Sequence, residues 1–281
     1  MKIARRTFIM GVGSSYIVAS STPRISLGCQ TNAWPVDPAH FDSLLSVLGK
    51  IHELGFAGFE TGFRNLQSEA DHPESARQRI ASSGLQFFGV HIFLGRYDEK
   101  THITPLELCE KVCQTASALG AQRLILSGAP VDTDDDLALK VEGLHRAGAV
   151  AKEFGMTLAY HNHSKEFGNS AWEYDGLLRL TDPNLVGLLL DAGHAFRGGA
   201  DVPALVEKNH RRIIGLHLRD FREGKQVPLG SGDFPLAQVA AVLKKTGWQG
   251  WALAEEERED GSKPGEAAAA PAIAALRKQF S

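Results

Sequence analysis

A strand-like segment followed by a helix-like segment recurs eight times along the chain, about every 30 residues, which is the size of a βα unit. Short apolar runs bounded by turn residues are typical of buried parallel strands. These runs occupy residues 25–29, 56–59, 86–90, 123–126, 156–160, 186–190, 213–216 and 251–254. Eight such units close most naturally on themselves, so the spacing predicts an α/β chain folded as a (β/α)8 barrel.

An open, doubly wound sheet is the alternative architecture. The first strand is not followed by the pattern G-x-G-x-x-G, which counts against a dinucleotide-binding fold. A chain of 281 residues can bury one full core, and no internal linker or low-complexity segment marks a second domain. We therefore expect a single barrel domain over residues 23–281.

The first 22 residues have a different character. Lys2 and the pair Arg5-Arg6 precede a mildly apolar stretch that ends near Ala19, which resembles a twin-arginine export signal. The stretch is too short to cross a bilayer, so no membrane span is predicted. Residues 1–22 are thus interpreted as an export signal, and the protein is expected to be periplasmic or otherwise exported. A cytoplasmic protein with an unrelated tail is the alternative.

Charge and cysteine content exclude some classes of function. The formal net charge of −3 provides no general attraction for nucleic acid. Three cysteines, Cys29, Cys109 and Cys113, are too few for a disulfide framework, and we interpret Cys109 and Cys113 as core residues. The expected partner is a small molecule, and self-association into a homo-oligomer is left open.

Metal-binding residue types stand at the ends of four successive strands. These residues are His161, Asp191, His217 and Glu255. Because the carboxyl ends of barrel strands share one face, where barrel enzymes keep their chemistry, we expect the four side chains to bind one divalent cation. Two imidazoles and two carboxylates suit Mn, Zn, Co or Fe better than Ca or Mg. Mn²⁺ is the first choice, with Zn²⁺, Co²⁺ or Mg²⁺ as alternatives.

Two further strand ends carry polar residues. Glu60 follows the second strand and His91 follows the third, so both are candidates to contact a substrate on the same face of the barrel. The glycines of PLGSGDFP (228–235) permit two interpretations. They could expose backbone N–H groups to a phosphate, or they could form a turn before a helix over 236–246, which we favour.

From residue 24 onward, the chain resembles the sugar phosphate isomerase/epimerase superfamily of xylose-isomerase-like TIM barrels. The motifs are YHNHSKEF (160–167), LLLDAGHAF (188–196), IGLHLRDF (214–221), PLGSGDFP (228–235) and GWQGWALAEEE (247–257). The resemblance implies that the metal ligands are the four residues named above. It also implies that His194 contacts the substrate, and that Arg219 and Asp220 match a basic-acidic pair of the family. The implied activity is a divalent-metal-dependent isomerase or epimerase that acts on a keto sugar or polyol derivative through an enediolate.

One departure leaves the catalytic base open. Many epimerases of the superfamily have a Glu at the end of strand five, where this chain has His161, so a mechanism with two carboxylates does not transfer directly. Glu255, His163 and Glu166 are the candidates for acid/base catalysis. The alternative function is a lyase or hydratase acting on a 3-keto-glycoside or an inosose by metal-assisted elimination. An abasic-site endonuclease is disfavoured by the charge of −3, and a non-catalytic sugar-binding barrel by the presence of Asp191 and Glu255.

Overall fold

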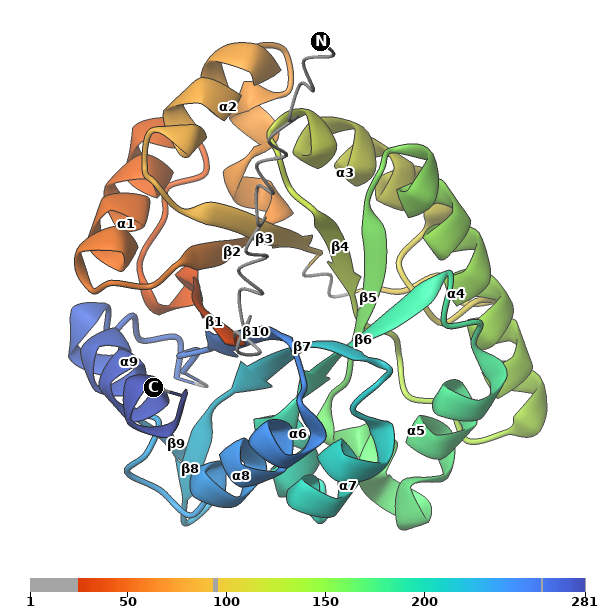
Figure 1. Ribbon diagram of the computed structural model, residues 1–281. Coiled ribbons are helices and arrows are strands. Elements are labelled where there is room, and N and C mark those ends of the chain that lie inside the picture. The colour runs from red at the N-terminus through yellow and green to blue at the C-terminus, as the bar shows by residue number, and fades with distance from the viewer. Residues whose placement is uncertain (1–24, 93–95, 259, 281) are drawn as a thin grey trace, which may run out of the picture.

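The computed structural model describes residues 25–92, 96–258 and 260–280. Within these residues, eight parallel strands form a closed barrel in the order β1-β10-β7-β6-β5-β4-β3-β2, and helices surround it (Figure 1). The strands are β1 (Ile25–Gln30), β2 (Gly58–Gly62), β3 (Gln86–His91), β4 (Arg123–Leu126), β5 (Thr157–His161), β6 (Val186–Asp191), β7 (Ile213–Leu218) and β10 (Gly250–Ala254). The predicted (β/α)8 class is confirmed. The proposed export signal lies outside the described residues.

The helices follow the strands around the barrel. They are α1 (Phe41–Glu53), α2 (Pro73–Ala81), α3 (Leu106–Ala118), α4 (Asp134–Glu153), α5 (Gly168–Leu180), α6 (Ala192–Arg197), α7 (Val202–Asn209), α8 (Leu236–Thr246) and α9 (Glu266–Phe280). Short 3-10 helices occupy Thr31–Ala33, Phe63–Asn65, Gln67–Glu69 and Ser164–Phe167. In the described part of the chain, no helix has the length and apolarity needed to cross a bilayer.

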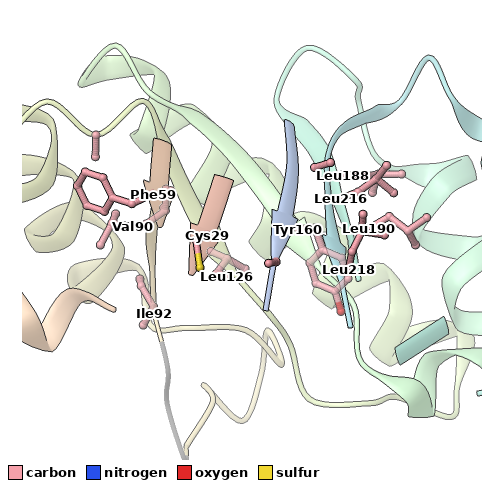
Figure 2. Close-up of a cluster of buried hydrophobic side chains, with 14 of the residues drawn as sticks. Cys29, Phe59, Val90, Ile92, Leu126, Tyr160, Leu188, Leu190, Leu216 and Leu218 are labelled. Atoms are coloured by element: carbon pink, nitrogen blue, oxygen red, sulfur yellow. The ribbon is translucent and has the colours of Figure 1, made fainter. Parts of the chain in front are cut away.

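Alternation along each strand divides the core into two layers. Leu188 and Leu190 point outward and pack with Leu216 and Leu218 of the next strand under the helices (Figure 2). Between them, Leu189 belongs to the interior cluster of the barrel, which also contains Phe88, Ile125, Ala159, Trp251 and Leu253. Because side chains alternate along a strand, the residue two positions after an interior residue also points inward. This places a polar layer above the apolar interior of the barrel.

Two elements were not expected from the sequence. A short antiparallel hairpin, β8 (Asp220–Arg222) and β9 (Lys225–Val227), follows β7 directly. The helix α6 starts immediately after Asp191, whose carboxylate accepts the backbone N–H of His194 as an N-cap. The helix α6 follows the predicted ligand Asp191, and the hairpin follows the strand that carries His217, so regular secondary structure continues directly after both ligands.

Candidate metal centre and active site

The structure brings the four predicted metal ligands together. One ligand atom from each of His161, Asp191, His217 and Glu255 lies within 4.8 Å of the other three, and all four residues are buried. Alternation explains the convergence, because His161 and Asp191 stand two residues after Ala159 and Leu189 of the barrel interior. We call these four residues the ligand cluster.

The ligand atoms crowd together without hydrogen bonds of normal geometry. Among the described residues, His161 Nε2, Asp191 Oδ2, His217 Nδ1 and Glu255 Oε2 are buried and make no such bond, although Arg219 lies within ion-pair distance of both oxygens and His217 Nδ1 is 2.5 Å from Glu255 Oε2. Ion-pair contacts nevertheless join them: Nε2 of His161 lies 3.4 Å from Asp191 Oδ2 and 3.7 Å from Glu255 Oε2. Buried polar atoms normally have partners, and one shared cation would supply a partner for all four. The cluster therefore fits a divalent metal.

The charge of the buried group also suits a divalent cation. Asp191, Glu255 and the neighbouring Glu60 are carboxylates, and Arg219 is the guanidinium in contact with the first two. With neutral imidazoles, three carboxylates and one guanidinium leave two negative charges. Burial alone would lower the pKa of His217, but the carboxylates of Glu255 and Glu60 raise it well above its usual value. The group thus attracts positive charge strongly.

Partners on the far side of each imidazole orient it toward the cluster. His217 Nε2 lies 2.7 Å from Glu60 Oε2, so this nitrogen carries a proton, and Nδ1, which lies 2.5 Å from Glu255 Oε2, is the nitrogen that a cation would bind in place of a second proton. Nδ1 of His161 lies 3.2 Å from Ser127 Oγ, which leaves Nε2 toward the cluster. Such partners of metal-binding histidines fix the tautomer and the ring orientation.

The two carboxylate ligands are oriented in the same way. Asp191 Oδ1 accepts the backbone N–H of His194 at 2.7 Å, so Oδ2 faces the cluster. The side-chain amide of Asn162 holds the backbone of Asp191 on both sides. Its Nδ2 donates to the backbone oxygen of Asp191 and its Oδ1 accepts the backbone N–H of Asp191, each at 3.0 Å. Glu255 Oε1 accepts a hydrogen bond from Asn32 Nδ2 at 3.3 Å, which leaves Oε2 toward the cluster. Each carboxylate therefore offers one oxygen to a metal.

Glu60 and His91 lie on the far side of His217. Besides His217, the Glu60 carboxylate accepts from His91 Nδ1 at 3.0 Å and from Gln30 Nε2 at 3.4 Å, and it is fully buried. Burial would raise the pKa of Glu60, but His217 and His91 lower it to about 2. Both carboxylate oxygens are thus engaged by protein groups, and Glu60 is placed to orient His217.

Arg219 lies between the carboxylates of the cluster. Its Nη2 is 2.9 Å from Asp191 Oδ2 and 2.5 Å from Glu255 Oε2, and its buried Nε has no hydrogen-bond partner in the part of the chain that the structure describes. Burial would lower the pKa of Arg219, but the two carboxylates raise it, so the guanidinium stays charged. The unused N–H group can donate to an oxygen of a bound molecule.

His163 and His194 lie beside the cluster. The ring centroid of His163 is 5.2 Å from that of His161 and 5.1 Å from that of His194. One ring nitrogen of His163 accepts the backbone N–H of Glu166, while Nδ1 of His194 lies 3.1 Å from Ser164 Oγ. Burial lowers the pKa of His194 to about 4 despite the opposing charge of Asp191. Both rings are therefore neutral at pH 7.

Glu166 is engaged away from the cluster. Oε1 accepts the Tyr160 hydroxyl and Oε2 accepts the backbone N–H of His163, each at 2.6 Å. Burial raises the pKa of Glu166 although Lys140 and Tyr160 oppose the shift. With both oxygens in use, Glu166 fixes the start of the 3-10 helix that carries His163.

The glycine-rich segment 228–235 is held by Asp220. The carboxylate of Asp220 accepts the backbone N–H groups of Gly230 and Gly232 at 3.0 and 2.8 Å, and that of Phe234 at 2.9 Å. These are the N–H groups that a phosphate would need, so they support the interpretation of the segment as a turn before α8. The sequence pairs Asp220 with Arg219 but gives no sign that it anchors a loop ten residues away.

The chain is similar to known proteins with a TIM-barrel fold. The family model described as xylose isomerase-like TIM barrel matches residues 48–279. An inosose dehydratase of Clostridium perfringens is 33% identical, and the alignment covers 84% of this chain and 91% of that protein. An inosose dehydratase of Geobacillus kaustophilus is 35% identical, but there the match covers 45% of this chain and the chain spans about half of that relative, 47%.

Solved structures share the architecture. A sugar phosphate isomerase/epimerase from Parabacteroides distasonis superposes with a TM-score of 0.71 at 20% identity, covering 96% of this chain and 99% of that one. At this level of identity the likeness establishes the fold. The family-model match over most of the chain goes further, and the protein belongs to the xylose isomerase-like TIM barrel family.

Proposed function

We propose that the protein is a divalent-metal-dependent carbohydrate enzyme that removes a proton next to a ketone and then expels a β-oxygen. The observation that carries the proposal is the convergence of four buried ligand atoms within 4.8 Å of one another at the carboxyl end of the barrel. His161, Asp191, His217 and Glu255 would hold the cation. When bound, a divalent cation polarises the ketone oxygen and stabilises the negative charge that develops on it.

Glu255 is the candidate base. Oε2 faces the cluster, and Asn32 holds the carboxylate through Oε1. The other carboxylates considered are engaged away from the centre of the cluster, because Glu60 binds two imidazoles and Glu166 binds Tyr160 and a backbone N–H, whereas Glu255 Oε2 lies within it, beside Arg219 and His217. Glu255 accepts the proton from the carbon beside the ketone, and the electron pair of that C–H bond enters the new double bond.

His163 is the candidate donor to the leaving oxygen. Because one of its ring nitrogens already accepts the backbone N–H of Glu166, the other carries the proton in the neutral ring. His163 can therefore donate a hydrogen bond to the leaving oxygen, but it lacks a free lone pair to act as a base. As the C–O bond breaks, the departing oxygen takes up the proton that Glu255 removed from the carbon, which returns Glu255 to its carboxylate form.

This division of roles favours elimination over epimerisation. An epimerase needs a base on one face of the substrate and an acid on the other, and many epimerases of the superfamily achieve this with two carboxylates. In this chain His161 stands at the strand-five position and serves as a ligand. Similarity to inosose dehydratases, which covers more than three quarters of the chain in three cases, supports the same outcome. We accordingly favour a lyase or dehydratase on a 3-keto-glycoside or an inosose, with Mn²⁺ as the expected ion.

The test is incubation in D₂O with Mn²⁺ and a panel of cyclic keto sugars, followed by NMR and mass spectrometry. Loss of water or of an alcohol together with deuterium exchange supports elimination, whereas exchange with inversion and no loss of mass would establish epimerisation instead. Glu255→Gln should lower the exchange rate by about 10²–10⁴-fold, as expected for a general base. Glu166→Gln, whose carboxylate is already occupied, should cause a smaller loss, and equal losses would remove Glu255 as the base.

A further inference from the structure

The loop that follows β1 touches the candidate base through Asn32. The strands β1 and β10 are neighbours in the barrel (Figure 1), so the residues after β1 lie beside Glu255, which follows β10. Nδ2 of Asn32 donates to Glu255 Oε1 at 3.3 Å. The NH₂ group must face Glu255, because a carboxylate accepts hydrogen bonds and would repel the amide oxygen. Asn32 therefore contacts the oxygen of Glu255 opposite to the one that faces the ligand cluster.

The backbone of this loop is held on two sides. The N–H of Asn32 donates to Gln30 Oε1 at 2.8 Å, and the carbonyl oxygen of Asn32 accepts Lys263 Nζ at 2.9 Å. The next residue is held in the same way, since the Ala33 carbonyl accepts the backbone N–H of Gly265 at 2.9 Å. The loop is thus clamped between the end of β1 and the segment before α9, and the Asn32 side chain extends from a fixed backbone.

The other contacts of Glu255 fix its backbone and its second oxygen. Its carbonyl oxygen accepts Gln226 Nε2 at 2.9 Å. Its Oε2 lies 2.5 Å from His217 Nδ1 and 2.5 Å from Arg219 Nη2. These contacts locate one oxygen of the carboxylate, and a contact on the other oxygen is needed to fix the plane of the group. Asn32 supplies that contact.

From these contacts we infer that Asn32 is a positioning residue for proton transfer, which holds Glu255 with a single oxygen toward the cation so that the carboxylate keeps the orientation of a base. The inference rests on the proposed function, in which Glu255 takes the proton. Without the Asn32 N–H, the carboxylate is free to turn and to offer both oxygens to a cation, a common mode for carboxylate ligands. Charge that is shared with a cation in this way is less available to a proton. Asn32 thus serves the transfer of the proton and not the retention of the metal.

The experiment measures hydrogen exchange and metal affinity separately in Asn32→Leu. The exchange probes are methyl 3-keto-β-glucoside and an inosose in D₂O at saturating Mn²⁺, and a fluorescent chelator reports the Mn²⁺ affinity. We expect exchange to fall about 10²-fold, as for a catalytic group moved by about 1 Å, and excess Mn²⁺ should not restore it. The Mn²⁺ affinity should escape the loss of about 10–100-fold that is usual when the partner of a metal ligand is removed.

Three further variants separate the hydrogen bond from the shape of the residue. Asn32→Asp keeps the shape but replaces the donor by an oxygen, so it should lower exchange at least as much as Asn32→Leu. Added to Glu255→Gln, Asn32→Leu should cause little further loss, because it acts through the residue already changed. Asn209→Leu is the matched control: it removes a hydrogen bond from Nδ2 to the Leu205 carbonyl at 3.0 Å, on α7, and should leave exchange at its native rate.

Four outcomes would overturn the inference. They are native exchange in Asn32→Leu, native exchange in Asn32→Asp, a loss of exchange that excess Mn²⁺ restores, and equal losses in Asn32→Leu and Asn209→Leu. Exchange that depends on Glu255 but not on Asn32 would remove the inference and leave the proposed function intact. Native protein that exchanges hydrogen with none of the probes would remove both.

Discussion

Replacement of Glu60 by Gln tests whether a residue that orients His217 controls metal binding. Glu60 Oε2 accepts the His217 Nε2 proton at 2.7 Å, while Oε1 faces His91 and Gln30. A glutamine keeps one oxygen and turns the other into a donor, so one of these contacts is lost or reversed. If the donor faces His217, the ring must move its proton to Nδ1, which then has no lone pair for a cation. The net negative charge of the buried group also falls by one.

The expected result is a loss of Mn²⁺ affinity of about 10–100-fold, which is usual for the partner of a metal-binding histidine. This corresponds to about 1.4–2.7 kcal/mol. Competition between the protein and a fluorescent chelator at fixed pH would measure it. Glu166→Gln is the matched control, because it removes the charge of another buried glutamate with two short hydrogen bonds but no bond to a metal-binding imidazole. Native affinity in Glu60→Gln, or an equal loss in Glu166→Gln, would refute the reasoning.

Three further predictions concern the scaffold and the N-terminus. Lys140→Met should lower the free energy of unfolding by about 3–5 kcal/mol in urea titration, because it leaves Glu173, now 2.6 Å from the ammonium, as an unpaired buried charge; an unchanged midpoint would contradict this. Asp220→Asn should cost about 1–3 kcal/mol and make segment 228–235 more sensitive to protease, since the amide cannot accept every N–H now bound; native protease resistance would count against it. Residues 1–22 fused to a reporter should direct its export, and lysine at positions 5 and 6 should block it; a reporter that stays in the cytoplasm would oppose the signal interpretation.

The positions of the four ligands could be predicted from the sequence because two simple regularities determine them. Each ligand follows a short apolar run, and a closed parallel barrel brings the carboxyl ends of its strands to one face. Alternation along β5 and β6 then turns His161 and Asp191 inward with the residues two positions earlier. Neither regularity needs knowledge of contacts between distant residues.

The partners of the polar residues could not be predicted in the same way. Glu60 lies in β2 and Glu166 follows β5, and the sequence suggests each for a role in the site. The structure shows that their oxygens are engaged, by imidazoles in one case and by Tyr160 and a backbone N–H in the other. The left-handed backbone at the beginning of α5 could not be predicted either. Asn169, Ser170 and Ala171 have φ values of 49°, 57° and 61°, whereas the neighbouring Gly168 has an ordinary φ of −60°.

The imidazole of His161 has a consequence for the charge of the whole site. With neutral histidines, the buried carboxylates and Arg219 leave two negative charges, and a divalent cation neutralises them. A carboxylate at the position of His161 would leave one negative charge beside the cation, and this charge would oppose the negative charge that develops on a substrate as its proton leaves. The histidine removes that opposition but also removes the second base. Under the proposed function, the site would take a proton from one face of a keto sugar, and the reaction would end with the loss of an oxygen rather than with protonation of the opposite face.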